Sequence, residues 1–214
     1  MENEAITETR TEIDLRIMRN SIGDLADEYF AKYSAKSPAK SELVTYAGIF
    51  SVLNTLFEGN FKDKTILEIG SDYGFFLYAL KQMGADVYAV DTNERIDRNI
   101  LESNGIRFSG KELITAKDEL KPVHIFPDAD FDKYDVLISK GVMNHSHISC
   151  RNFPMLMYGD TTSLMSKIKT LSDFHVHSTD LDIFSNKDYV KELGYHRPFF
   201  KESCFQKISL LTPK

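Results

Sequence analysis

Residues 65–74 of the chain read Thr65-Ile66-Leu67-Glu68-Ile69-Gly70-Ser71-Asp72-Tyr73-Gly74. The first half of this segment is short, β-prone and almost wholly apolar, which is typical of a parallel strand buried on both faces. Gly70 and Gly74 form the turn that follows, and residues 75–83 return to helical periodicity. At the carboxyl end of a first strand the backbone turns sharply and a ligand approaches it closely, and glycine permits both.

An acidic residue ends the next predicted strand. Residues 86–90 are β-prone and apolar, and Asp91 follows them directly. This position lies about 20 residues beyond the first turn, where a carboxylate can accept the hydroxyl protons of a ribose. The strand, the glycine turn, the helix and Asp91 together predict a ligand crevice built around Glu68–Gly74 and Asp91.

Further along the chain, predicted strands and helices alternate. The strands fall near 106–108, 134–139 and 174–178, and the helices fall at 93–103, within 155–171 and at 186–193. Alternation in this order implies right-handed crossovers and a parallel sheet. Two extended stretches near 197–200 and 204–211 have few residues between them, which favours an antiparallel hairpin at the sheet edge. We therefore expect an α/β fold with a doubly wound, mostly parallel sheet and a C-terminal antiparallel hairpin strand.

The N-terminal part of the chain is predicted to be helical. Apolar residues recur at steps of three and four from Met18 to Tyr33, and again from Leu43 to Phe57. Pro38 separates the two stripes and suits a first helical turn, and Gly59 suits the end of the second helix. These patterns predict an N-terminal helical extension over residues 1–60 and an α/β domain over residues 61–214.

Composition and charge narrow the class of partner. Lys and Arg number 26 against 32 Asp and Glu, a net charge of −6, so the sequence offers no excess of basic residues for a phosphate backbone. Cys150 and Cys204 are far apart in the sequence and match no disulfide or metal-binding spacing, which is typical of a reduced, intracellular protein. Residues 1–4 lack the features of a signal peptide, and no apolar run of about 18 residues occurs. We expect a cytoplasmic protein with a small-molecule substrate, without nucleic acid or membrane as partner; a homodimer stays open.

The same motifs resemble those of class I, Rossmann-like, S-adenosylmethionine-dependent methyltransferases. The first motif of that family is an acidic residue followed by three alternating glycines; Glu68, Gly70 and Gly74 match it, and Asp72 replaces the middle glycine. Asp91 matches the acid of the second motif. Residues 134–139 resemble the fourth strand of the family and residues 189–195 its last helix, so the resemblance covers roughly residues 60–214.

The resemblance implies S-adenosyl-L-methionine as the cofactor, S-adenosyl-L-homocysteine as the product, and methyl transfer to an oxygen or nitrogen nucleophile of a small molecule. N-terminal helices of that family cap the cofactor, and residues 70–74 and Asp91 would hold its methionine and ribose. Ser139 and Lys140 would face the methionine end and the substrate. The family also has an acidic residue that contacts adenine, and in this sequence it could be Glu112, Asp118 or Glu119. The implied cofactor residues are Glu68, Gly70, Ser71, Asp72, Tyr73, Gly74, Asp91, Thr92, Ser139 and Lys140.

Histidines and acids elsewhere in the sequence have structural interpretations as well as functional ones. His145 follows the fourth predicted strand and is our candidate general base, because imidazole titrates near neutrality; a loop or structural histidine is the competing interpretation. The cluster of His145, His147 and Cys150 lacks the paired spacing of a zinc site, and residues 128–132 lack the glycine and distal glutamate of a calcium loop, so we predict no metal. His175 and His177 are interpreted as strand residues.

Two other functions compete with methyl transfer. Asp72 at the place of the middle glycine, together with the indistinct acid of the third strand, motivates a non-catalytic relative that serves as a binding or partner subunit. A nicotinamide-dependent oxidoreductase would need Gly-x-Gly-x-x-Gly in the first turn, which residues 70–76 do not supply.

Overall fold

The computed structural model describes most of the segments predicted as regular structure. They are residues 40–71, 74–90, 98–108, 133–140, 169–179, 186–202 and 207–214, with Arg16, Tyr29, Ala31 and Met165. The segment 155–171, within which a helix is predicted, lies largely outside them, and residues 109–132 lie outside them entirely.

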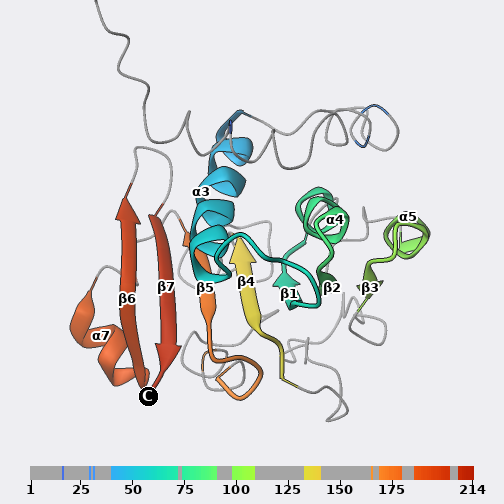
Figure 1. Cartoon of the computed structure of the whole chain (residues 1–214). Helices are drawn as coiled ribbons and strands as arrows, with labels where there is room; N and C mark the ends of the chain where they lie inside the picture. The colour runs from blue at the N-terminus through green and yellow to red at the C-terminus, as the bar shows by residue number, and fades with distance from the viewer. Residues whose placement is uncertain are drawn as a thin grey trace, which may run out of the picture.

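The described strands form a seven-stranded sheet in the order β3-β2-β1-β4-β5-β7-β6 (Figure 1). Strands β1 to β5 run parallel, and β7 lies antiparallel between β5 and β6. The strands are β1 (Thr65–Ile69), β2 (Asp86–Val90), β3 (Arg107–Phe108), β4 (Val136–Lys140), β5 (His175–Thr179), β6 (Tyr195–Glu202) and β7 (Lys207–Pro213). The predicted fold class is confirmed, including the C-terminal antiparallel hairpin.

Helices cover both faces of this sheet. They are α3 (Lys40–Leu56), α4 (Phe75–Gln82), α5 (Arg98–Ser103) and α7 (Lys187–Glu192). Figure 1 shows α3 and α4 in front of the sheet. The face toward them, here the α3 face, contributes Ile66, Val136 and Val176 to one apolar cluster. The opposite face, here the α7 face, contributes Leu67, Ile69, Leu137 and Leu211, which pack with Val190 of α7. Alternate residues of each strand therefore serve two separate cores.

Helix α3 belongs to the core on the α3 face. Ile49, Phe50 and Leu53 are completely buried there with residues of β1, β4 and β5. A Cβ atom on Gly48 would overlap the Ile208 side chain of β7, so glycine allows α3 to lie close to the sheet. The backbone turns after the helix at Gly59, which has φ of 77°. The division of the chain at residue 60 stays a prediction, as does the capping role of the N-terminal helices.

None of the helices that the structure describes is long and apolar enough to cross a membrane.

Candidate functional site

The strand order reverses between β1 and β4. The chain runs from β1 outward to β2 and β3, then returns to place β4 on the other side of β1. Ligands of open α/β sheets bind outside the carboxyl ends of the strands at this switch point. The register pairs Glu68 with Ile138 and Ile69 with Ser139, so the ends of β1 and β4 meet at the same level. Residues 68–71 and 139–140 are therefore brought together.

The turn after β1 places a hydroxyl at the switch point. Gly70 adopts the left-handed φ of 77°, and Gly74 N donates to Ser71 O at 2.9 Å just before α4 begins. The side chain of Ser71 is completely buried, and its Oγ has no hydrogen-bond partner in the part of the chain that the structure describes. A buried hydroxyl that makes no hydrogen bond lowers stability, so such an atom is a candidate for contact with a ligand.

Gly74 has a packing role that does not depend on any ligand. Its φ is 72°, a left-handed conformation that L side chains adopt at a cost. A Cβ atom there would overlap Cδ2 of Leu101 in α5 and lie 3.6 Å from Ile106 Cδ1. Gly74 thus lets the start of α4 approach α5 and the residue before β3.

Glu68 brings a carboxylate into the apolar core at the same end of β1. Its side chain is completely buried, and its neighbours across the sheet are Ala89 of β2 and Ile138 of β4. Placing a carboxyl group among apolar residues costs several kcal/mol unless specific contacts compensate, on the order of the values found for buried ions. Buried carboxyl groups beside a crevice are therefore candidates for a functional role.

Ser139 and His177 form a buried polar pair beside this end of β4. The two residues are register partners on β4 and β5, both are completely buried, and Ser139 Oγ lies 2.5 Å from His177 Nδ1. Burial lowers the pKa of His177, and the neighbouring His175 lowers it further. The imidazole is therefore neutral near neutral pH.

His175 lies two residues before His177 on β5, on the same face of the sheet. Its Nε2–H donates to Ser172 O at 2.9 Å, which fixes the tautomer because a carbonyl oxygen only accepts. Burial lowers the pKa of His175 to about 4, against smaller opposing effects of that hydrogen bond and of Asp173. The interpretation of both histidines as strand residues is confirmed. The pairing of His177 with Ser139 was not predicted, although His-x-His in a buried strand places both imidazoles on one face.

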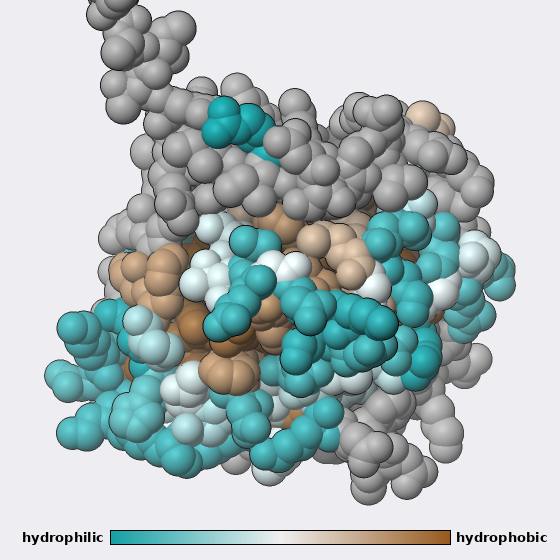
Figure 2. All heavy atoms as spheres, viewed as in Figure 1, coloured by the Kyte–Doolittle hydropathy of each residue, from teal (hydrophilic) through white to brown (hydrophobic). Residues whose placement is uncertain are grey.

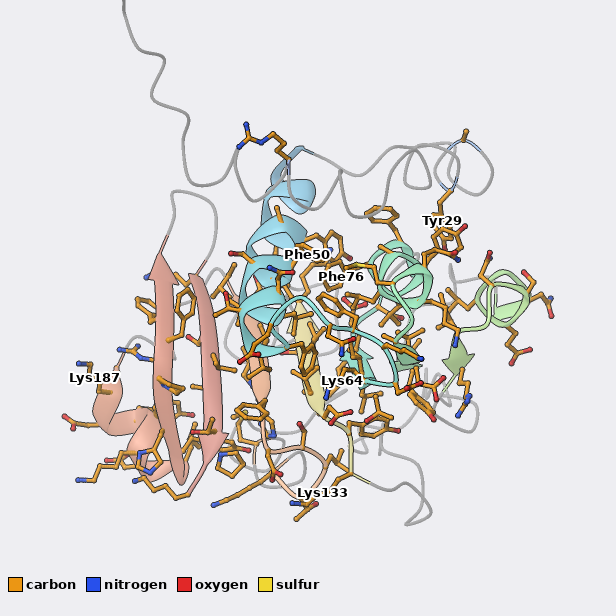
Figure 3. The ribbon with its side chains drawn as sticks, in the orientation of Figure 1. Tyr29, Phe50, Lys64, Phe76, Lys133 and Lys187 are labelled. Atoms are coloured by element: carbon orange, nitrogen blue, oxygen red, sulfur yellow. The ribbon has the colours of Figure 1, made fainter. Side chains whose placement is uncertain are left out.

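Lys140 ends β4 on the α3 face, where aromatic rings gather. Its Nζ lies 4.4 Å from the ring centroid of Tyr46 in α3, a distance suited to a cation–π contact. Tyr46 stacks on Phe76 at 4.9 Å between centroids, and Tyr29 packs on Tyr78 at 4.7 Å. Figure 3 shows Phe50 and Phe76 between α3 and α4, with Tyr29 at the outer side of α4. N-terminal residues thus contact the helix that follows the glycine turn.

Several predicted site residues lie outside the described residues. They are Asp72, Tyr73, Asp91, Thr92 and His145, and the three alternatives for the adenine contact also fall there. These assignments stay predictions. Within the described ranges, no group of three or more His, Cys, Asp or Glu side chains is arranged to hold a metal ion.

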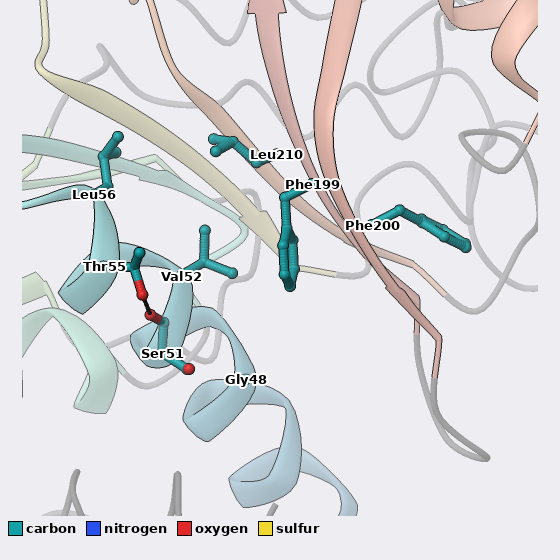
Figure 4. Close-up of a pocket in the computed structure, with 8 residues that line it drawn as sticks. All are labelled: Gly48, Ser51, Val52, Thr55, Leu56, Phe199, Phe200 and Leu210. Atoms are coloured by element: carbon teal, nitrogen blue, oxygen red, sulfur yellow. Dashed lines mark hydrogen bonds between the residues drawn. The ribbon is translucent and has the colours of Figure 1, made fainter. Parts of the chain in front are cut away.

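A separate groove of about 610 Å³ lies between α3 and the β6–β7 hairpin (Figure 4). Figure 2 shows apolar side chains among hydrophilic ones on this side of the molecule. The described residues that line the groove carry no titratable side chain; they are Gly48, Ser51, Val52, Thr55, Leu56, Phe199, Phe200 and Leu210. Its described lining shares no residue with the switch point and offers no acid, base or nucleophile stronger than a hydroxyl.

Comparison with known proteins bears on the fold. No protein-family model and no curated protein matches the sequence. Magnesium protoporphyrin IX methyltransferase from Synechocystis PCC 6803, solved with bound S-adenosylmethionine, is 16% identical with a TM-score of 0.54, over 94% of this chain and 97% of that one. A candidate RNA methyltransferase from Pyrococcus horikoshii is 10% identical with a TM-score of 0.57, over 96% of this chain and 98% of its own. With the strand order and the terminal hairpin, these likenesses show that the chain has the class I methyltransferase fold.

Proposed function

We propose that this protein is an enzyme that transfers a methyl group from S-adenosyl-L-methionine to a small-molecule acceptor. The observation that carries the proposal is the switch point between β1 and β4, where Glu68, the left-handed Gly70 and the buried hydroxyl of Ser71 lie together. The similar structure from Synechocystis holds S-adenosylmethionine, which supports the choice of cofactor.

The residues at the switch point fit this cofactor. The buried Oγ of Ser71 would form a hydrogen bond with a polar group of the methionine part. The acidic side chain of Glu68 would favour the cationic ammonium and sulfonium groups of the cofactor nearby. Asp91, directly after β2, would accept the ribose hydroxyls. The bound cofactor supplies a methyl group already activated on a sulfonium. The protein then has to align the acceptor and exclude water, and Lys140 and the aromatic residues of α3 and α4 border the region where the acceptor would enter.

The charge of the chain favours a small molecule as the methyl acceptor. The similar solved structures include an enzyme for a porphyrin and a candidate RNA methyltransferase, so the fold alone does not choose. The net charge of −6 disfavours a polyanion and favours a small molecule. His145 remains our candidate general base for acceptors that must lose a proton.

Isothermal titration calorimetry with S-adenosylhomocysteine and S-adenosylmethionine tests the proposal directly. We expect saturable binding of both, and an absence of heat at millimolar ligand would overturn it. Incubation with labelled S-adenosylmethionine and separate pools of metabolites and RNA then tests the acceptor. Label in the metabolite pool alone is the expected result, and label in RNA alone would contradict the small-molecule assignment.

Ser71→Ala is expected to weaken binding of S-adenosylhomocysteine about 3- to 10-fold, the value of one hydrogen bond. Removing a buried hydroxyl that makes no hydrogen bond with the described protein should leave stability unchanged or slightly higher. Ser209→Ala is the matched control, because Ser209 Oγ on β7 is also buried without a partner among the described residues. Equal affinity of wild type and Ser71→Ala for S-adenosylhomocysteine would show that Ser71 does not contact the cofactor.

Asp91→Ala is expected to weaken the same binding about 10- to 100-fold, because hydrogen bonds to a charged group contribute more than neutral ones. Asp86→Ala is the control on the same strand. Asp86 begins β2 at the opposite edge of the sheet and pairs with Lys81 and Arg107 on the surface. We expect Asp86→Ala to bind like wild type, and calorimetry compares the three proteins. Unchanged affinity in Asp91→Ala would refute the ribose assignment.

A further inference from the structure

His177 and Ser139 are joined across two neighbouring strands at the switch point. The hydrogen bond between Ser139 Oγ and His177 Nδ1 is 2.5 Å long, and neither side chain is exposed to solvent. Ser139 is also the register partner of Ile69, the residue before Gly70. The hydroxyl held by His177 therefore belongs to the residue that lies beside the start of the glycine turn.

The surroundings of His177 make its presence costly. It lies on the α7 face of the sheet between its register partners Ser139 of β4 and Ser209 of β7, beside an apolar core to which this face supplies Ile69, Leu137 and Leu211. Burial of the imidazole costs the desolvation of two ring nitrogens, and the hydrogen bond to Ser139 offsets part of this cost. A buried polar residue in such a place implies that its hydrogen bond has a use beyond packing.

We propose that His177 is a positioning residue, which holds the hydroxyl of Ser139 in the orientation that contacts the cofactor at the switch point. This inference rests on the proposed function. A hydroxyl has one proton and two lone pairs, and the bond to Nδ1 engages one of these, so the remaining ones point away from the ring. Without His177 the hydroxyl rotates among its staggered positions, and the contact with the cofactor is lost for part of the time.

The neutral state of the imidazole suits this role. Burial lowers the pKa of His177, so the ring is neutral near neutral pH and bonds to Ser139 without carrying a charge into the core. The strand frame on either side is fixed by the paired backbones of β4, β5 and β7. The orientation of Ser139 then depends on one side chain, which a substitution can remove without changing the sheet.

Binding of S-adenosylhomocysteine, measured by calorimetry, tests the inference in three variants. We expect His177→Leu to bind about 3- to 10-fold more weakly, the effect of one misdirected hydrogen bond. We expect His177→Asn to regain affinity to within about twofold of wild type, because the amide of asparagine occupies the place of Nδ1. His175→Leu is the matched control: it removes an imidazole from the same strand and face, but one bonded to Ser172 O.

The outcomes separate the inference from the function on which it rests. If wild type does not bind S-adenosylhomocysteine, the proposed function fails. If wild type binds and His177→Leu binds equally well, only the positioning role fails. A loss of affinity in His175→Leu equal to that in His177→Leu would assign both effects to stability, which thermal denaturation of the unliganded variants measures, and would also overturn the proposal. If His177→Leu does not fold, His177→Gln replaces it, since its amide extends beyond the place of Nδ1.

Discussion

Replacement of Gly74 by alanine is expected to lower the free energy of unfolding by about 2–5 kcal/mol. Two effects add. The left-handed φ of 72° costs an L residue about 1–2 kcal/mol. The new methyl group would also overlap Cδ2 of Leu101, a completely buried side chain, and overpacking of this kind costs about 1–3 kcal/mol. Urea denaturation followed by circular dichroism measures the change.

Gly59→Ala separates these two effects. Gly59 has the same left-handed conformation, with φ of 77°, but among the described residues a Cβ atom there would meet only Asn54 Oδ1 at 3.8 Å. This variant should lose about 1–2 kcal/mol, the conformational cost alone. A Gly74→Ala protein no less stable than Gly59→Ala would show that α5 moves freely away from α4. The packing account of Gly74 would then be wrong.

Local sequence patterns predicted the elements whose signal is local. The apolar run at residues 65–69 forms β1 over the predicted residues, and the strand before Asp91 spans Asp86–Val90 as expected. The close spacing of the last two extended stretches correctly implied an antiparallel hairpin. In each case the period of the side chains or the length of the connection is enough to specify the structure.

Tertiary contacts were not accessible in the same way. The pairing of Ser139 with His177 depends on the register of β4 against β5, two strands far apart in sequence. The apolar residues at helical spacing predicted the helix α3. Its position on the α3 face of the sheet depends on the strand residues against which these apolar residues pack. Gly74 was predicted from its motif to approach a ligand, and its contact with Leu101 of α5 adds a second reason for glycine. Such contacts follow from the assembled sheet and not from any local period.

Acidification from pH 6.5 to pH 4 is expected to destabilise the protein through its two buried histidines. The pKa of His175 falls from 6.5 to about 4 on folding, and that of His177 is also lowered. Below pH 6.5 these histidines bind protons in the unfolded chain but stay neutral in the folded chain, so the free energy of unfolding falls as the pH falls. For His175 alone the loss amounts to about 3 kcal/mol and is complete once the pH passes below its folded pKa.

The slope of stability against pH isolates this contribution from that of the carboxylates. Each proton bound only by the unfolded state contributes about 1.4 kcal/mol per pH unit. We therefore expect His175→Leu to reduce the slope between pH 6 and pH 4.5 by about this amount, and His175→Leu with His177→Leu to reduce it by about twice as much. Urea denaturation at four or five pH values gives these slopes, and the acidic residues are the same in all three proteins.

The difference in stability between wild type and the leucine variants is expected to change with pH, which makes this experiment decisive for the protonation state of the pair. At pH 7 the leucine variants lose the hydrogen bonds to Ser172 O and Ser139 Oγ, so they are expected to be less stable than wild type. At pH 4.5 the difference should shrink or reverse, because the folded wild type then excludes protons from more buried imidazoles than either variant does. Parallel curves for wild type and both variants would mean that the histidines are protonated as easily in the folded chain as in the unfolded one. The conclusion that the imidazole beside Ser139 is neutral would then be wrong.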